Sequence, residues 1–339
     1  MSVETQAPPL EGRALVTGGG GFLGKAIVRR LLDRGMQVRV LARGDYPELR
    51  EWGAETVRGS VSDPACVDAA VQGCSVVFHV AAKVGASLNP EPFVKTNVEG
   101  TQAILDACRK HGVRRLVYTS TPSVVHAGGD VEGADESLPY PEHFEAHYPA
   151  TKAEAERRVL AANDDSLSTV AIRPHLVWGP GDTNLLPRIV ERAKAGRLRL
   201  VGKVSKKVDT TYVDNAVDAH VQAAERLHPG APCAGKAYFV ANDEPVPQEQ
   251  IINGMLAAAG LPPVDKRVSV GVAKTLGAVL EFKARITRSD EEPLMTRWVA
   301  DQLSTAHWYD LSAAKRDLGY APKVGVDEGL RRLKASLDT

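Results

Sequence analysis

The sequence has no excess of either charge and contains few cysteines. Lys and Arg together number 42, and Asp and Glu also number 42. Proteins that bind along nucleic-acid phosphates usually carry a basic excess, so we expect no nucleic-acid partner. The four cysteines form no C-x-x-C pair, which gives no sign of a zinc ribbon or a redox dithiol. Free thiols suit a reducing compartment, and the expected location is the cytoplasm.

Long apolar runs, repeats and targeting signals are also missing. No apolar run approaches the roughly 20 residues that a membrane-spanning helix needs. The opening MSVETQAPPLEG has neither the basic start nor the apolar core of a signal peptide. We therefore expect no integral membrane span. A length of 339 residues suits one large α/β domain with a substrate-binding extension, or two domains.

Short β-rich runs alternate with helical stretches through the first half of the chain. Between the first two runs, apolar residues recur at helical intervals, and Gly35 is placed to end that helix. This alternation predicts an α/β fold, a doubly wound parallel sheet of the Rossmann type with helices on both faces. The predicted strands are 14–16, 38–42, 56–59, 76–80, 115–120 and 170–174.

The pattern changes after Pro174, where turn residues and proline punctuation become frequent. We expect a dinucleotide-binding Rossmann domain at residues 10–177 and a first substrate region at 178–204. The chain would then return to the Rossmann domain at 205–240. Residues 241–339 would complete a smaller, interleaved C-terminal substrate-binding region and its packing.

The motif TGGGGFLG directly follows the first predicted strand and opens the first helix. Gly18 would permit the tight turn, Gly21 would let a pyrophosphate approach the backbone, and Gly24 would let helix and strand pack closely. The helix N-terminus offers free N–H groups to phosphates. The predicted phosphate contacts are Gly18, Gly21, Phe22, Leu23 and Gly24.

This glycine spacing, T-G-x-x-G-x-x-G, resembles that of the extended short-chain dehydrogenase/reductase superfamily, and the resemblance covers nearly the whole chain. The stretches YTSTPSV, RPHLVWGPGD and HWYDLSAAKRDLGY are most similar to the 3β-hydroxysteroid dehydrogenase branch. Within it, GGGGFLG, RGDYP and HLVWGPGD resemble the β-keto acid reductases of bacterial long-chain olefin biosynthesis. The resemblance implies reduction of a long-chain 2-alkyl-3-oxoalkanoic acid to the 2-alkyl-3-hydroxyalkanoic acid by NADPH.

The superfamily uses a Tyr-x-x-x-Lys pair on a helix together with a hydroxyl at the end of the fifth strand. The resemblance maps the pair onto Tyr148 and Lys152, whose spacing places both on one helix face. The hydroxyl maps onto Thr121, with Ser120 and then Ser123 as alternatives. Tyr148 would protonate the ketone oxygen, Lys152 would lower the phenol pKa, and Thr121 would hold the oxygen in place.

The residues after the second predicted strand bear on the choice of cofactor. Ala42 stands where an NAD enzyme usually carries an acid, and Arg43 follows it. A guanidinium can hold a 2′-phosphate, so we expect NADP(H), with Arg43 as the phosphate ligand. The nearby Asp45 keeps NAD(H) open. Further contacts implied by the resemblance are Val61 at the adenine, Ala81, Ala82 and Lys83 along the ribose, and Pro174 beneath the nicotinamide.

The implied partner is a hydrophobic small molecule with two long alkyl chains. An apolar tunnel would hold it, or its candidate residues would form the core of the smaller region instead. The resemblance also implies a homodimer and allows assembly with other enzymes of the pathway. The segment 272–286 reads as a core or dimer face, with an interfacial helix as the alternative. The candidate tunnel residues are Trp178, Leu185, Leu186, Leu276, Val279, Leu280 and Phe282.

Other interpretations stay open at this point. One is a 3β-hydroxysteroid or sterol-4-carboxylate 3-dehydrogenase using NAD(P), and a remoter one is an inactive dinucleotide-binding regulatory protein. The stretch HFEAH lacks the H-E-x-x-H order, so we expect no metal site. His126 and His175 would be either substrate contacts or buried structural residues.

Overall fold

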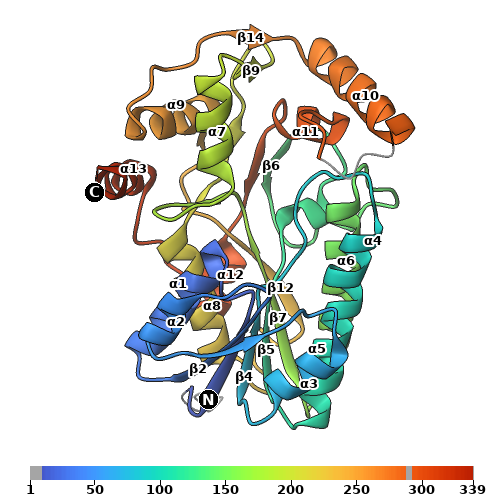
Figure 1. The fold of residues 1–339 in the computed structure, drawn as a ribbon, viewed down its shortest axis with the longest axis vertical. Coiled ribbons are helices and arrows are strands. Elements are labelled where there is room, and N and C mark those ends of the chain that lie inside the picture. Colours follow the sequence, from blue (N-terminus) through green and yellow to red (C-terminus); the bar gives the residue numbers. More distant parts are fainter. Residues whose placement is uncertain (1–9, 288–291, 339) are drawn as a thin grey trace.

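The computed structural model describes residues 10–287 and 292–338, and its centre is one parallel sheet (Figure 1). The strand order is β12-β7-β5-β4-β1-β2-β3, with every neighbouring pair parallel. The order reverses direction at β1, as in a doubly wound sheet, so the predicted fold class is confirmed. Each predicted strand is present. The bounds are β1 Arg13–Thr17, β2 Gln37–Ala42, β3 Glu55–Arg58, β4 Val76–His79, β5 Arg115–Thr119, β7 Ser168–Pro174 and β12 Lys236–Val240.

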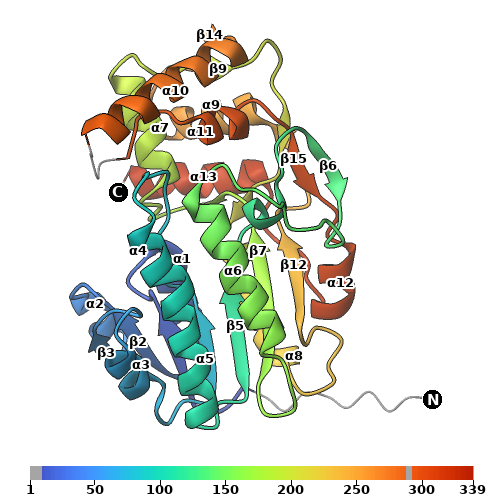
Figure 2. The ribbon, with the colours of Figure 1, turned by 90° about the vertical axis from the view of Figure 1, so that its right-hand side faces the viewer.

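Helices cover both faces of this sheet and bury a separate apolar core on each. One face carries α1 (Phe22–Asp33) and α8 (Val213–Arg226), which pack against each other. The other face carries α3 (Pro64–Val71), α5 (Gly100–Lys110) and α6 (His147–Ala161), and Figure 2 shows α5 and α6 side by side on it. Asp63 caps α3 by accepting from the N–H groups of Ala65 and Cys66.

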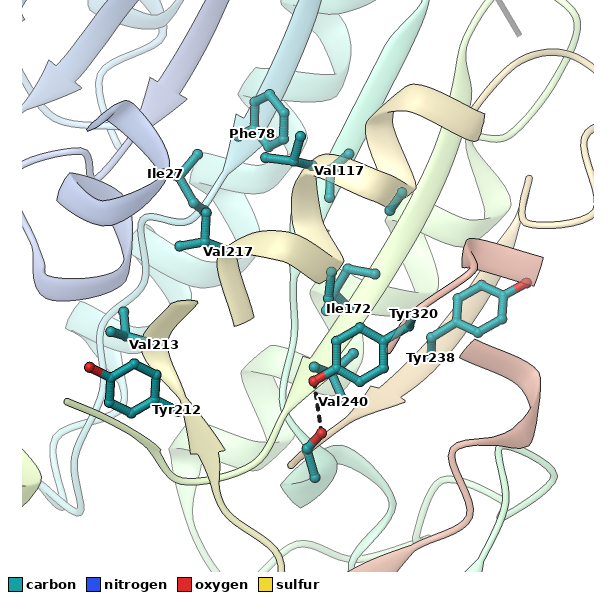
Figure 3. Packing of buried hydrophobic residues seen from close by; sticks show 14 of the residues in the cluster. Ile27, Phe78, Val117, Ile172, Tyr212, Val213, Val217, Tyr238, Val240 and Tyr320 are labelled. Atoms are coloured by element: carbon teal, nitrogen blue, oxygen red, sulfur yellow. Dashed lines mark hydrogen bonds between the residues drawn. The ribbon is translucent and has the colours of Figure 1, made fainter. Parts of the chain in front are cut away.

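Helix α8 lies far from α1 in the sequence, and burial of apolar side chains brings the two together. Val213 and Val217 of α8 lie on the side of the sheet where Ile27, Phe78 and Val117 are buried (Figure 3). The exposed fraction of each of these side chains is at most 5%. Burial of a large aliphatic side chain contributes about 1.5–3 kcal/mol, so this contact fixes the returning segment to the sheet.

A smaller region sits beyond the carboxyl ends of the main strands (Figure 1). Its four-stranded sheet has the order β13-β10-β15-β6, and two short pairs, β8 with β11 and β9 with β14, complete it. These strands are β6 Val131–Ala134, β8 Val177–Trp178, β9 Leu200–Val201, β10 Lys207–Val208, β11 Thr211–Tyr212, β13 Val246–Pro247, β14 Arg267–Val268 and β15 His307–Tyr309. Strand β6 precedes α6 in the chain, yet it pairs with β15, which lies near the C-terminus. The smaller region is therefore built from interleaved segments of the chain.

Several helices surround this smaller region and connect it to the main sheet. Among the residues that the structure describes, no helix is both long and apolar enough to cross a bilayer. The remaining helical segments are α2 Pro47–Glu51, α4 Glu91–Phe93, η1 Val94–Glu99, η2 Pro122–Val125, α7 Leu185–Lys194, α9 Gln248–Ala258, α10 Val270–Thr287, α11 Arg297–Gln302, α12 Ser312–Leu318 and α13 Val326–Leu337.

The predicted apolar tunnel is wrong for several of its candidate residues. Trp178 is fully buried, and its ring meets that of Tyr212 edge-on at 5.5 Å, so it is part of the core. Leu276, Val279 and Phe282 of α10 are instead 48%, 58% and 65% exposed. They face outward because the opposite side of α10 carries the small residues that pack on α11.

Candidate active site

One cavity of about 390 Å³ joins the glycine loop to the predicted catalytic pair. The carboxyl ends of β2, β4 and β5 line it together with the loop between β1 and α1. Helix α6 contributes Tyr148 and Lys152, one turn apart, to the same cavity. The structure therefore brings together two motifs that lie more than a hundred residues apart in the sequence.

The glycine loop has a backbone that side chains would obstruct. Gly18 has φ +68°, in the left-handed region, and a Cβ there would lie 2.9 Å from the main chain of Ala81. A Cβ on Gly24 would lie 2.2 Å from the main-chain oxygen of Gly18. Gly21 precedes α1 and provides no side-chain cap, so the first N–H groups of that helix are left for another acceptor. A dinucleotide pyrophosphate fits this open cradle at a helix N-terminus.

The part of the cavity at the carboxyl ends of β2 and β3 bears on which nicotinamide cofactor is bound. Arg43 lines the cavity beside Ala42 and Ser60, and Val61 also lines it. Asp45 forms an ion pair with Arg50, whose hydrogen bond holds the pKa of that carboxyl below its usual value. Asp45, the acid that left NAD(H) as an alternative cofactor, is thus already paired with the guanidinium of Arg50.

Tyr46 also lines the cavity, although no motif in the sequence had indicated it. Its ring lies against the glycine loop, where a Cβ on Gly20 would be 2.1 Å from the ring. Lys25 lies 5.1 Å from the centre of the same ring. The pattern R-G-D-Y-P could have indicated this contact, because an aromatic residue so soon after the second strand can reach the loop that follows the first strand.

The predicted ribose segment is partly in the cavity wall. Ala81 and Ala82 line the cavity, whereas Lys83 does not. The main chain of Lys83 is held instead, because its N–H donates to Asn97 Oδ1 at 2.7 Å and its oxygen accepts from Asn97 Nδ2 at 3.0 Å. Pro174 is buried at the end of β7 outside the lining, and Val177 lines the cavity.

Tyr148 is a half-buried phenol at the start of α6. Burial raises the pKa of Tyr148 to about 12, and a hydrogen bond with Thr121 partly opposes that rise. The ring of Trp298, on α11, lies 6.4 Å away at a steep angle. The phenol is therefore protonated at neutral pH, as a proton donor must be before it reacts.

Lys152 is 2% exposed and is held away from bulk water. Its Nζ donates to the main-chain oxygen of Thr119 at 2.5 Å and lies 4.0 Å from the centre of the Tyr118 ring. Burial lowers the pKa of Lys152 to about 7, although the negative charge of Glu156 opposes this. The lysine that was expected to lower the pKa of Tyr148 directly is thus engaged by a carbonyl and a ring.

Thr121 and Ser120 both remain candidates for the catalytic hydroxyl. Thr121 is the N-cap of η2, where its Oγ1 accepts from Ser123 N, and it interacts with the phenol of Tyr148 without lining the cavity. Ser120 lines the cavity, and its buried hydroxyl has no hydrogen-bond partner among the described residues. Thr121 is better placed relative to Tyr148, whereas Ser120 has the freer hydroxyl.

The histidines considered as substrate contacts form a buried group outside the cavity wall. The ring of His307 lies 4.9 Å from that of His126 and 5.8 Å from that of His175. Burial lowers the pKa of His175 to about 3 and that of His307 to about 4. The structural role is the better description of these rings. The described residues contain no group of three or more His, Cys, Asp or Glu arranged to hold a metal ion.

The fold and the cavity define a Rossmann-type, NAD(P)-dependent oxidoreductase. Residues 15–267 match the 3-beta hydroxysteroid dehydrogenase/isomerase family. The chain belongs to this family, and the expected branch is confirmed. The family match ends at the start of β14, so it includes both the glycine loop and the Tyr148 helix.

Similar proteins with assigned activities cover nearly the whole chain. A 2-alkyl-3-oxoalkanoate reductase of Stenotrophomonas maltophilia is 55% identical and is matched over 96% of this chain and 99% of its own length. A protein of the same name from Shewanella oneidensis is 49% identical, over 96% and 86%. The sterol-4-alpha-carboxylate 3-dehydrogenase, decarboxylating, of Mus musculus is 34% identical, over 94% and 89%.

Solved structures share the same architecture. The crystal structure of gox2253 superposes with a TM-score of 0.77 at 27% identity, covering 96% of this chain and 97% of its own. MoeE5 in complex with UDP-glucose and NAD gives 0.73 at 24% identity, covering 96% and 99%. At that identity the second likeness shows the fold alone.

Proposed function

We propose that the protein reduces a long-chain 2-alkyl-3-oxoalkanoic acid to the 2-alkyl-3-hydroxyalkanoic acid with NADPH. The observation that carries the proposal is the single cavity shared by the glycine cradle and the Tyr148–Lys152 pair. The substrate class comes from the relatives of that name at 55% and 49% identity, whose matches run almost end to end.

The side chains at the site fit the proton transfer that this reduction requires. When bound, the cofactor supplies a hydride to the ketone carbon, and the ketone oxygen then needs a proton. Tyr148 carries that proton because burial holds its pKa near 12. Thr121, or Ser120 beside it, would donate a hydrogen bond to the same oxygen and so stabilise the charge that develops there. Lys152, with a pKa near 7, would help return a proton to the phenol.

NADPH is the proposed cofactor because of the charges around the expected ribose 2′-position. Arg43 lines the cavity there, and Arg58 approaches it, with its Nε 3.4 Å from the main-chain oxygen of Arg43. Asp45 is neutralised by Arg50, so it would not repel a phosphate. The remaining proposed contacts are Gly18, Gly21, Phe22, Leu23, Gly24, Val61, Ala81 and Ala82, whereas the predicted Lys83 and Pro174 lie outside the cavity lining. A homodimer, assembly with pathway enzymes and a cytoplasmic location stay predictions.

Oxidation of a sterol or steroid 3-hydroxyl is the second candidate function. The 34% identity to a sterol-4-alpha-carboxylate 3-dehydrogenase supports it, and its substrate is also a hydrophobic ring or chain bearing a carboxylate. The same tyrosine and lysine would serve that reaction. Reduction of a keto acid is favoured by the higher identity to the reductases.

A substrate panel tests the assignment, with NADPH or NADH supplied for reduction of the ketone and NADP⁺ or NAD⁺ for oxidation of the hydroxyl groups. It contains a long-chain 2-alkyl-3-oxoalkanoic acid, a 3β-hydroxysteroid, a 4-carboxysterol and UDP-glucose. We expect turnover of the keto acid with NADPH at a kcat/KM at least about tenfold above that of any other pair. Turnover of only the steroid or sterol would select the second function, and turnover of only the nucleotide sugar would contradict both.

A further inference from the structure

Helix α10 turns a continuous apolar stripe away from the protein. The stripe residues recur at intervals of three or four, so they share one side of this 18-residue helix. Figure 1 shows α10 at the upper edge of the molecule, with α11 on its inner side. The exposed fractions are 59% for Val272, 48% for Leu276, 58% for Val279, 65% for Phe282 and 67% for Ile286.

The inward side of α10 has the opposite composition. Ala273 is 2% exposed, and a Cβ on Gly277 would lie 2.7 Å from the main chain of α11 at Arg297. Glu281 is buried and accepts from both the N–H and the Nε of Arg297. A surface helix usually buries its large apolar residues, so the arrangement of α10 is reversed. Its packing fixes the apolar stripe toward the outside.

The charges of α10 indicate what could cover this stripe. Its one acid is Glu281 on the inner side, and Lys274 pairs with Asp301 of α11, which leaves Lys283 and Arg285 as the exposed cations toward the outside. Lys283 follows Val279 by four residues and lies within the stripe. A second copy of this chain would bury that amine against apolar side chains with no acid from the stripe to pair with it. A lipid surface lets a lysine extend to the headgroups while the apolar side chains insert.

We propose that α10 docks flat on an anionic lipid surface, with Val272, Leu276, Val279, Phe282 and Ile286 inserted and Lys283 and Arg285 at the headgroups. Anionic headgroups attract such cations near the membrane surface. The inference stands on the surface of α10 and does not depend on the proposed substrate. Docking through α10 would also bear on how substrate reaches Tyr148. Helix α11 packs on α10 and carries Trp298, whose ring is 6.4 Å from that of Tyr148.

Cosedimentation of the full-length protein with vesicles tests this proposal. We expect binding to phosphatidylcholine vesicles that contain phosphatidylglycerol, weaker binding to pure phosphatidylcholine, and a loss of the difference at high salt. The double variant Val279→Ser/Phe282→Ser should bind at least about tenfold more weakly. Lys283→Glu should weaken binding to the anionic vesicles only.

Leu337→Ser is the matched control, because Leu337 is 47% exposed on α13, away from α10 in Figure 1. It should bind as the wild type does. Thermal unfolding of each variant checks that the exposed substitutions leave the fold intact. The proposal is overturned if the wild type stays in the supernatant with anionic vesicles, or if the double variant binds equally well. A wild-type dimer that the double variant converts to monomers, without vesicle binding, would assign the stripe to self-association instead.

Discussion

Lys152 donates a hydrogen bond from its Nζ to the main-chain oxygen of Thr119, at 2.5 Å. Thr119 is the last residue of β5, so the carboxyl edge of the sheet positions the amine. The ring of Tyr118 lies 4.0 Å from the same nitrogen and excludes water there. A carbonyl dipole and a ring face therefore stabilise the amine, and no carboxylate among the described residues forms an ion pair with it. That environment makes its charge sensitive to pH near neutrality.

Replacing Lys152 by Met should stabilise the fold while abolishing most activity. Burial lowers the pKa of Lys152 from 10.5 to about 7, so the unfolded chain binds more protons between these values. For the wild type, the free energy of unfolding should thus rise with pH across that window. Lys152→Met removes the buried amine, and we expect a gain on the order of 2 kcal/mol at pH 7. Urea unfolding at pH 7 and pH 9.5 measures it, and a gain that is equal at both pH values would contradict the burial argument.

Thr121 and Ser120 can be separated by paired substitutions. Thr121→Ala should lower kcat about 10²–10³-fold, the usual loss for one donor to a developing oxyanion. Thr121→Ser keeps the hydroxyl and should recover most of that loss. Ser120→Ala should stay within a few-fold of the wild type. If the Ser120 variant shows the larger loss, the unpartnered hydroxyl of Ser120 is the donor and the assignment to Thr121 is wrong.

A methyl group on Gly24 should damage both the fold and cofactor binding. Its Cβ would lie 2.2 Å from the oxygen of Gly18, so the loop must shift. We expect a loss of about 2–4 kcal/mol in the free energy of unfolding, together with weaker NADPH binding by fluorescence titration. Gly35→Ala is the control at the other end of α1, with φ +77° and nothing within 4 Å. It should cost about 1 kcal/mol and leave NADPH affinity unchanged.

Arg43→Ala should reduce the preference for NADPH over NADH. Loss of a charge-assisted contact to a phosphate costs about 1.5–3 kcal/mol, so the KM for NADPH should rise roughly 10–100-fold. The KM for NADH should change less than about threefold. Arg34→Ala removes an exposed cation at the C-terminal end of α1, outside the cavity lining, and should alter neither value. An equal rise for both cofactors would show that Arg43 does not contact the 2′-phosphate.

The main sheet was predictable because its signals are local. Strand β1, the glycine loop and the start of α1 follow one another, and the order of Gly18, Gly21 and Gly24 requires no distant partner. Helix α6 could likewise be inferred from the spacing of Tyr148 and Lys152, once the resemblance gave that pair a role. Burial of the amine, and hence the direction of its pKa shift, depends on Thr119 and Tyr118 and could not be seen in the pair itself.

The smaller region was less predictable because its contacts are long-range. β6 pairs with β15, so Val131 lies opposite His307. Nothing in either short segment specifies the other. The prediction for α10 was wrong for the same reason. Its apolar residues suggested a tunnel lining, whereas Gly277 and Glu281 determine which side of the helix packs on α11. A helix that buries its small residues cannot be distinguished by periodicity from one that buries its large ones.

The most direct test compares the wild type with Tyr148→Phe in the reduction of a long-chain 2-alkyl-3-oxoalkanoic acid by NADPH at pH 7. The substitution removes one hydroxyl from a half-buried ring and leaves the glycine cradle untouched. We predict that kcat falls at least about 10²-fold, the usual contribution of a general acid, while the Kd for NADPH changes less than about twofold. A Tyr148→Phe enzyme that keeps its kcat within about threefold would contradict the assignment of this phenol as the proton donor.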